Sequence, residues 1–372
     1  MKLTAKVKLQ PTPEQFELLK QTLETANAAC NWMSDQAWQT KTFGQFQLHK
    51  LVYAQTREQF KLAAQVVVRC LSKVADAYKL DKQTKRTFKP LGGIAYDDRV
   101  LNWRLPTKTV SIWTVAGRQT IPFVCGERQW QLLQTQQGET DLCSIRGSFY
   151  LFAVCNVDEP DPLDVEGVLG IDLGVTNLAV DSDGTVMSAQ HVNNVRFRQR
   201  RLRAKLQSKG TQAARRRLRK LAGQERRFAT QTNHEISKHI VTKAQGTKRA
   251  IALEDLTHIR ARVTVRKPQS AQWHSWSFHQ LRSFIEYKAQ QRGVPVIAVN
   301  PRNTSRTCPC CGHIDKANRP SQSKFSCVAC GFSGLADYIA AMNIRSRAAV
   351  DQPSIPDATL RGSSARDKAQ AL

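Results

Sequence analysis

The chain has 372 residues, of which 41% are hydrophobic and 23% charged, and its 56 Lys and Arg outnumber 30 Asp and Glu to give a net charge of +26. The length allows about two or three domains with a hydrophobic core, and the composition fits a soluble globular protein. The charge favours a polyanionic partner, nucleic acid before an anionic membrane, because the sequence has no basic amphipathic segment that would anchor it to lipid.

Membrane and export segments are not expected. No run approaches about 18 consecutive apolar residues, which a membrane-spanning helix needs. The first ten residues, MKLTAKVKLQ, lack the apolar core of a secretory signal and alternate like a strand. Half of the ten cysteines are scattered along the chain, which is typical of free thiols in a reducing compartment. We therefore expect a cytoplasmic protein with no membrane partner.

The first half of the chain combines helices with short strands. After the strand of residues 1–10, Pro11, Pro13 and Glu14 predict the start of a helix over 11–38. Apolar residues at helical spacing predict a second helix over about 48–79. Short β-type runs separated by polar turns then extend over 86–157 and indicate a small barrel or sandwich. We assign 1–10 and 81–160 to this β domain and treat 11–80 as a helical insertion in it.

The second half alternates strands and helices, which predicts an α/β domain. It follows a turn-rich linker at 158–167 and opens with a hairpin over 168–186, whose turn is DSDG. Further expected elements are helical texture over 196–227 with breaks at Gly210 and Gly223, a helix at 229–245, a strand at 249–256, a helix at 275–293 and a strand at 294–300. We assign 166–303 and 332–348 to this domain and expect a disordered tail at 349–372.

Four cysteines near the C-terminus predict a zinc site. They form two C-x-x-C motifs, Cys308/Cys311 and Cys327/Cys330, separated by 15 residues, which is a spacing typical of zinc ribbons. A glycine directly after each motif allows the tight turn that points backbone amides at the sulfurs. Four thiolates make a closed structural site for one zinc ion, within a ribbon that we place at 304–331. Cys310, a fifth thiol inside the first motif, is a competing ligand.

Three acidic residues in apolar surroundings predict a second metal site. Asp172 interrupts one strand, Glu254 follows apolar residues within another strand-like run, and Asp337 lies at the start of an apolar helical stretch. Carboxylates brought together there would repel one another unless a cation such as Mg²⁺ were bound. Two Mg²⁺ ions about 4 Å apart can clamp both oxygens of a phosphodiester during its hydrolysis. The alternatives are that Asp337 merely caps its helix and that Asp255, on the opposite strand face, replaces Glu254.

The basic stretch 196–227 holds 14 Lys and Arg and a single acid, Glu225. Like charges at i,i+4 destabilise an isolated helix, and a bound phosphate backbone removes that penalty. A solvated helix face is the alternative. We expect affinity to fall steeply with salt. The candidate nucleic-acid-binding residues are Arg198, Arg201, Arg203, Lys205, Arg215, Arg216, Arg219 and Arg226.

Several of these segments resemble the TnpB proteins of bacterial insertion sequences, the presumed ancestors of the type V CRISPR effectors. The strong resemblance covers about residues 166–347, and the N-terminal half matches only loosely. Its motifs are GIDLGVTNLAV, then LEDL, then TSRTCPCCG, FSCVACG and ADYIAAMNI, with KLQPTPEQ near the start and NHEISKHIV in the middle of the chain.

The resemblance implies a multidomain α/β plus β protein. Its RNase H-like (RuvC) nuclease domain would contain an inserted zinc ribbon, and its wedge-like β-barrel would carry an inserted helical recognition bundle. Asp172, Glu254 and Asp337 would be the catalytic acids of an RNA-guided DNA endonuclease that binds two Mg²⁺. The partners would be a guide RNA from the transposon end, one protein per RNA, and double-stranded target DNA beside a short adjacent motif. There would be no small-molecule substrate, and the location would be the nucleoid of a bacterial or archaeal cell.

Two positions depart from the family pattern. Ile339 stands where the family commonly has Asn, although Asn343 is kept, and Glu235 rather than Lys follows His234. Loss of a polar group near Asp337 could loosen that acid or alter metal affinity. Neither change removes a predicted ligand.

Three other functions fit parts of the sequence. GIDLGVTN also resembles the first phosphate loop of the actin and heat-shock ATPases, but no second phosphate loop follows, and the ribbon and the charge stay unexplained. A catalytically silent guided repressor would usually have lost one of the three acids. A small type V CRISPR effector would use the same chemistry with an RNA from another source, which the sequence does not distinguish.

Overall fold

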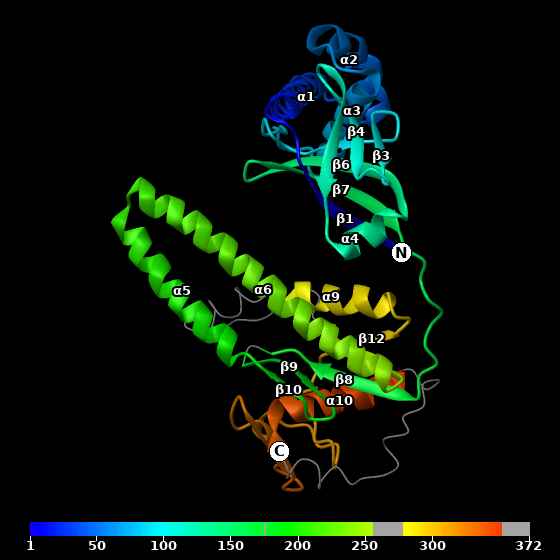
Figure 1. Cartoon of the computed structure of the whole chain (residues 1–372). Helices are drawn as coiled ribbons and strands as arrows, with labels where there is room; N and C mark the ends of the chain where they lie inside the picture. Colours follow the sequence, from blue (N-terminus) through cyan, green and yellow to red (C-terminus); the bar gives the residue numbers. More distant parts are fainter. Residues whose placement is uncertain (175, 256–277, 352–372) are drawn as a thin grey trace. The chain divides into compact units, whose positions relative to one another are not determined.

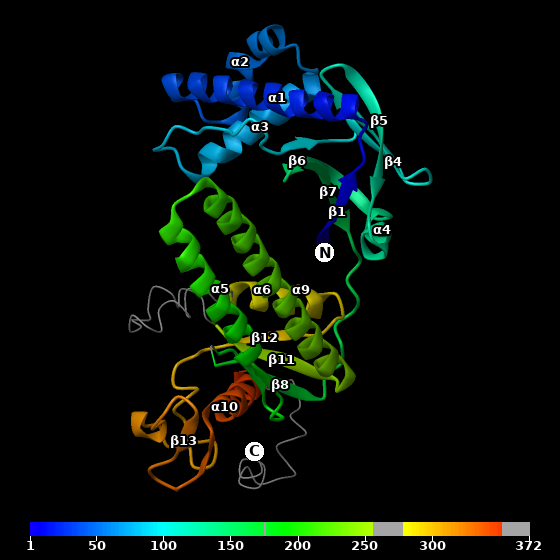
Figure 2. The same ribbon diagram turned by 60° about the vertical axis from the view of Figure 1, so that its left-hand side comes forward.

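The computed structural model describes residues 1–174, 176–255 and 278–351, which form two compact units, Met1–Asp158 and Glu159–Leu372. The first unit is a curled antiparallel sheet that carries helices (Figures 1 and 2). Its strand order is β2-β6-β7-β1-β5-β4-β3. In chain order its elements are β1 (Lys2–Leu9), α1 (Pro13–Thr40), α2 (Gln45–Phe60), α3 (Ala64–Leu80), β2 (Ile94–Tyr96), β3 (Leu101–Arg104), β4 (Thr109–Thr114), β5 (Gly117–Val124), α4 (Glu127–Leu133), β6 (Gln136–Ile145) and β7 (Ser148–Asn156).

The sheet of the first unit is a nearly closed barrel. Its two edge strands, β2 and β3, are joined by a short turn in which Leu101 N donates to Asp97 O at 2.8 Å. Across the gap, Trp103 Nε1 of β3 donates to Thr140 Oγ1 of β6 at 3.3 Å. The first strand pairs with β7 and β5, so α1, α2 and α3 interrupt the sheet between its first two strands in the sequence.

The helices of this insertion are confirmed, with one correction. Thr12 caps α1 with a capping box that includes Gln15, and Pro13 opens the helix as expected. The single helix expected over 48–79 is wrong, because the chain breaks between α2 and α3 at Lys61, whose φ is 49°. Leu62 is 2% exposed there, and its burial helps α2 and α3 pack side by side. No glycine or proline marks this turn, so periodicity alone misses it.

The second unit is built on a five-stranded mixed sheet in the order β10-β9-β8-β11-β12. Strands β8, β9 and β10 are antiparallel neighbours, and β11 lies parallel to both β8 and β12. Its elements are β8 (Gly167–Asp172), β9 (Asn177–Asp181), β10 (Val186–Ser188), α5 (Gln190–Lys209), α6 (Gln212–Gly246), β11 (Arg249–Glu254), α9 (Phe278–Gln290), β12 (Val296–Val299), η1 (Lys316–Asn318), β13 (Lys324–Ser326), β14 (Ser333–Leu335) and α10 (Ala336–Asp351).

Helices cover both faces of this sheet (Figure 1). Leu169 and Ile171 of β8 pack with the C-terminal half of α6 and with α9. Val168, one residue earlier, packs with α10 on the other face. Successive residues of one strand therefore face different helical layers, as the pleat requires. This alternation decides which strand residues lie beneath α10.

Most of the expected elements of the second unit are present. Gly210 ends α5 in the left-handed region with φ 64°, but the break expected at Gly223 is wrong, because α6 runs through it. A single interior glycine costs only about 1 kcal/mol relative to alanine, which the buried face of α6 offsets. The last helix continues to Asp351, beyond residue 349, and residues 352–372 of the expected tail lie outside the described residues. The start of the helix expected at 275–293 and the end of the strand expected at 249–256 also lie outside them.

Candidate functional site

Asp172 and Glu254 lie side by side at the carboxyl ends of two parallel strands. The register pairs Leu253 of β11 with Ile171 of β8, so the next residue on each strand is an acid. Both acids alternate with apolar residues that face α6 and α9, and so both lie on the α10 face. The rival Asp255 lies one residue further on, is exposed and is 3.5 Å from Arg282 Nη1.

Asp337 reaches the same face from α10. A Cβ at Gly170 would lie 2.2 Å from Ala341 O and 2.6 Å from Arg345 N, so the backbones of β8 and α10 cross in close contact at this glycine. Asp337 precedes Ala341 by one helical turn, which places the two on the same side of α10. Asp172 follows Gly170 by two residues on the same face of β8. The glycine thus fixes the helix that carries the third acid close to the strand that carries the first.

The three carboxylates influence one another electrostatically. Burial, and then the charges of Glu254 and Asp337, raise the pKa of Asp172 well above its usual value. Burial also raises the pKa of Glu254. Among residues 1–174, 176–255 and 278–351, only the four ribbon cysteines bring three or more potential ligand atoms within 4.8 Å of one another. The ligand atoms of the three acids are therefore not all within 4.8 Å of one another.

Residues that the sequence analysis did not select hold these acids. Asn177 Nδ2 donates to Asp337 Oδ2 at 2.9 Å, and Arg319 Nη2 of the ribbon approaches Asp337 Oδ1 at 3.2 Å. The Thr304 hydroxyl donates to Glu254 Oε1. Asn177 lies in the first motif and Thr304 in TSRTCPCCG, so both were quoted without being assigned a role. Arg319 lies in a polar stretch of the ribbon with no pattern that would have pointed to it.

The departure at Ile339 has a structural explanation. Its side chain is fully buried in a core cluster with Phe325 of the ribbon and Tyr338, so an apolar residue suits its position. Asn343, one turn further on, donates from Nδ2 to Thr304 O at 2.7 Å and to Thr307 O at 2.8 Å. The retained asparagine therefore positions the loop whose threonine contacts Glu254.

The structure brings together the four predicted cysteines. Cys308 Sγ lies 3.6 Å from Cys330 Sγ, and Cys311 Sγ lies 3.6 Å from Cys327 Sγ. Tetrahedral zinc with bonds of about 2.3 Å spaces its sulfurs by about 3.8 Å, so the donor set fits this ion. The backbone amide of Phe332 lowers the pKa of the Cys330 thiol to about 7. Cys310 is exposed and lies outside the cluster.

Both motif glycines adopt the backbone that the tight turn needs. Gly312 has φ 74° and Gly331 has φ 72°, in the left-handed region that glycine tolerates best. Their amides donate to the carbonyls of Cys308 and Cys327 at 2.9 and 3.0 Å. The two motifs therefore share one turn geometry.

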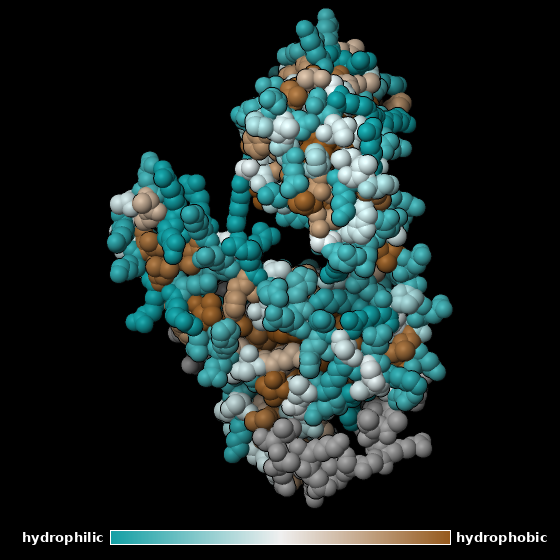
Figure 3. All heavy atoms as spheres, viewed as in Figure 1, coloured by the Kyte–Doolittle hydropathy of each residue, from teal (hydrophilic) through white to brown (hydrophobic). Residues whose placement is uncertain are grey.

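The eight candidate nucleic-acid-binding residues lie on two helices joined by a short turn. Arg198, Arg201, Arg203 and Lys205 are on α5, and the other four are on α6. Seven are exposed, whereas Arg203 is half-buried and pairs with Glu225, the single acid of this stretch. Figure 3 shows brown apolar patches among the teal hydrophilic surface over this helical hairpin.

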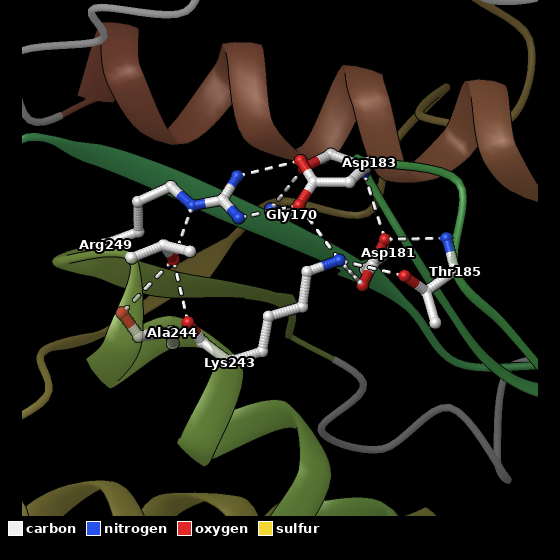
Figure 4. Close-up of polar contacts among 9 residues, drawn as sticks. Gly170, Asp181, Asp183, Thr185, Lys243, Ala244 and Arg249 are labelled. Carbon is white, nitrogen blue, oxygen red and sulfur yellow. Dashed lines mark hydrogen bonds and ion pairs between the residues drawn. The ribbon is translucent and has the colours of Figure 1, made fainter.

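An ion network fixes the turn between β9 and β10 (Figure 4). Lys243 Nζ of α6 is 2.6 Å from Asp181 Oδ2 and 2.9 Å from Asp183 Oδ2. Arg249, at the start of β11, donates to both carboxylate oxygens of Asp183 at 2.8 and 2.6 Å. These hydrogen bonds and charges lower the pKa of Asp183. DSDG was interpreted only as a hairpin turn, because its basic partners come more than 50 residues later.

Two family models match the second unit. One, described as "Probable transposase", matches residues 152–258, and the other, "Cas12f1-like, TNB domain", matches residues 278–344. A cryo-EM structure of a Cas12f1–sgRNA–target DNA complex has a similar fold, with a TM-score of 0.61 and 18% identity, over 90% of this chain and 83% of that one. The likeness shows that the chain shares this α/β fold.

Sequence relatives of two kinds match parts of this chain. The CRISPR-associated endodeoxyribonuclease Cas12f1 of Sulfoacidibacillus thermotolerans is 41% identical over 119 residues, which are 32% of this chain and 26% of that protein. The TnpB-like protein MJ0751 of Methanocaldococcus jannaschii is 29% identical over 197 residues, 50% of this chain and 70% of the relative. The putative RNA-guided DNA endonuclease InsQ of Escherichia coli K12 is 32% identical over 201 residues, 48% of each chain.

The matches thus span about a quarter of Cas12f1 and half of InsQ. In the part of the chain that the structure describes, no helix combines the length and the apolar character needed to cross a bilayer. Both family models and both kinds of relative agree that this chain is similar to TnpB-like proteins and to Cas12f1.

Proposed function

We propose that this protein is an RNA-guided DNA endonuclease encoded by an insertion sequence, with a RuvC-like active site formed by Asp172, Glu254 and Asp337. The observation that carries the proposal is the shared register of Asp172 and Glu254 on the face crossed by α10. Burial raises the pKa of both Asp172 and Glu254, so keeping these carboxylates charged beside Asp337 costs stability unless a cation is bound. A cytoplasmic, nucleoid-associated location follows from a DNA substrate.

The three acids would hold two Mg²⁺ ions. When bound, the ions would activate a water and stabilise the leaving 3′ oxygen, giving 5′-phosphate ends. The protein's own groups orient the ligands: Thr304 fixes one oxygen of Glu254, and Asn177 fixes one oxygen of Asp337. Arg319 brings a positive charge to the same carboxylates from the ribbon. Its guanidinium would balance their charge before metal binds.

The basic residues of α5 and α6 would bind the phosphate backbone. Seven exposed cations with one nearby acid form a surface that attracts a polyanion without reading its sequence. The partners would be a guide RNA made from the transposon end, with one protein per RNA, and double-stranded DNA that pairs with the guide. The curled sheet of the first unit would serve as the wedge-like domain and α1, α2 and α3 as the recognition bundle.

One zinc ion would close the ribbon. Metal analysis of the purified chain should find one zinc per molecule, and Cys327→Ser should lose it because one of four thiolates is gone. Cys310→Ser is the matched control and should keep its zinc, since that thiol lies outside the cluster. Equal zinc content in both variants would contradict the assignment.

The function is tested by expressing the gene with its flanking DNA and sequencing the RNA that co-purifies. The complex is then incubated with target DNA carrying a randomised flank. We expect one discrete RNA from the downstream flank, and cutting beside a short motif that stops when Mg²⁺ is chelated. A discrete RNA with binding but no cutting would indicate a repressor, and the absence of RNA would contradict the guided function.

A further inference from the structure

A pocket of about 670 Å³ opens between α5, α6 and the start of α9. It is separate from the three acids and from the ribbon, and none of its lining residues belongs to either metal site. Its volume falls within the roughly 300–1,000 Å³ of small-molecule sites, so it has room for one nucleotide but not for a duplex. The lining contains a positively charged rim, two aromatic rings and three amide side chains.

The rim is strongly basic. Arg200 and Arg226 are exposed, and no acceptor in the described part of the chain contacts either of them. Arg196 and Arg203 also line the pocket, against one acid, Glu225, which pairs with Arg203. A ligand with one or two phosphates would therefore meet guanidinium groups whose planar forks suit phosphate oxygens.

The interior favours a flat, partly apolar group. Phe197 of α5 is 54% exposed, and Phe228 of α6, which is partly buried, also lines the pocket. A ring that keeps more than half of its surface in water contributes less to folding than a buried one, whereas base–aromatic stacking is favourable and tolerant of sequence. Phosphate alone would use the arginines but not Phe197.

An amide beside the cavity has an unmet acceptor. Gln199 Oε1 is enclosed by protein atoms and accepts no hydrogen bond from any described residue. Such a buried acceptor costs free energy until a donor reaches it. The amino or imino N–H groups of a nucleobase are donors of this kind, and a turn of the Gln199 side chain would present the oxygen to them.

We propose that this pocket binds a single nucleotide that is unstacked from a single-stranded segment of nucleic acid. Arg200 and Arg226 contact its phosphates, Phe197 stacks on its base, and Gln199 accepts a hydrogen bond from the base edge. The inference rests on the proposed function only in that the chain binds nucleic acid, and it requires no cleavage. The strand can be RNA or DNA, since phosphate and base are common to both.

The test uses the full-length protein, freed of RNA at high salt, and fluorescent ten-residue oligonucleotides. Each is made with bases and as an abasic chain of the same charge, and Kd is measured by anisotropy without Mg²⁺. The wild type should bind the base-bearing oligonucleotide roughly tenfold more tightly than the abasic one. Phe197→Ala should abolish that preference, and Phe197→Trp should keep it, because a ring is retained.

Two controls separate stacking from charge and from general aromatic loss. Arg217→Ala, an exposed α6 residue outside the pocket, should weaken binding of both oligonucleotides equally. Phe46→Ala removes a ring that is 73% exposed on α2 and should leave the preference unchanged. A preference that survives Phe197→Ala, or its absence from the wild type, would overturn the proposal.

The same measurement identifies the strand. Ribose and deoxyribose versions of each oligonucleotide are compared, and the larger base preference marks the strand that uses the pocket. Intact base preference in a protein that never cuts DNA would refute the nuclease and leave the pocket standing. Guided cutting by the wild type, together with a base preference that Phe197→Ala does not change, would refute the nucleotide pocket and leave the nuclease function standing.

Discussion

Glu254 is held by two successive hydrogen bonds that begin on α10. Asn343 binds the backbone carbonyl of Thr304, and the Thr304 hydroxyl binds Glu254. The hydroxyl opposes the effect of burial on the pKa of Glu254, because it favours the charged carboxylate. The sequence could reveal the acid, since a charge in an apolar strand needs a reason. It could not reveal the threonine, whose partner lies 50 residues away.

Thr304→Val removes this hydroxyl while keeping the shape of the side chain. We expect roughly 10- to 100-fold weaker metal affinity, because residues that orient a ligand contribute about that much. A Mg²⁺ titration of cleavage would measure it. Thr307→Val is the matched control, since the one hydrogen-bond partner of the Thr307 hydroxyl among the described residues is the Asn303 carbonyl. Indistinguishable titrations of the two variants would count against a positioning role.

Among the secondary-structure elements, a close backbone contact positions α10 against β8, and charge pairs hold the turn between β9 and β10. The apolar runs of β8 and β11 show in the sequence, but both strands are buried on both faces, so their register does not. The break between α2 and α3 and the continuity of α6 through Gly223 do not follow from the sequence either, because tertiary packing overrides local propensity at both places. The crossing at Gly170 is equally invisible in the sequence, where that residue is one glycine in an apolar run.

Gly170→Ala should separate α10 from β8. A Cβ would meet backbone atoms at 2.2 and 2.6 Å, which no side-chain rotation relieves. We expect a loss of roughly 1–3 kcal/mol in unfolding free energy, measured by urea, and a larger fractional loss of cleavage because Asp337 moves. At Gly246 a Cβ meets nothing within 4 Å, so Gly246→Ala should be neutral or slightly stabilising. Equal stability of both variants would refute the close crossing.

Asp183→Asn should weaken the turn between β9 and β10. Arg249 is 7% exposed, and its two hydrogen bonds to a half-buried carboxylate make this pair stronger than a surface ion pair. We expect a loss of about 2–3 kcal/mol in unfolding free energy at pH 7. Glu166→Gln, which breaks an exposed pair with Lys248, should cost under about 1 kcal/mol.

The pH dependence of this effect has a defined sign. The folded state lowers the pKa of Asp183, so its contribution is complete above the unfolded value of about 4 and is lost as pH falls towards the folded value. The difference between Asp183→Asn and the wild type should therefore shrink from pH 7 to pH 3. A difference that stays constant would show that hydrogen-bond geometry, rather than charge, stabilises the turn.

For the whole molecule, most of the sequence-based expectations about partners, metal sites and family came from the net charge and the order of the motifs. A net charge of +26 and two cysteine motifs pointed to nucleic acid and to a closed metal site, and two family models match residues 152–258 and 278–344, within or close to the region of the expected resemblance. The order of α/β elements predicted the second unit, because parallel strands need helical crossovers. The pocket between α5 and α6 could not be predicted from the sequence, because it depends on how two helices packed side by side place Phe197 and Gln199.

Asp172, Glu254 and Asp337 are expected to serve chemistry and not folding. The most direct measurement compares wild type and Asp172→Asn, each purified with its own RNA, for guided binding of target DNA and for its Mg²⁺-dependent cleavage. We predict unchanged binding, cleavage reduced at least about 100-fold, and equal or greater thermal stability in chelator, because a buried repulsive charge is removed. Retained cleavage, or binding lost in parallel with it, would contradict the account.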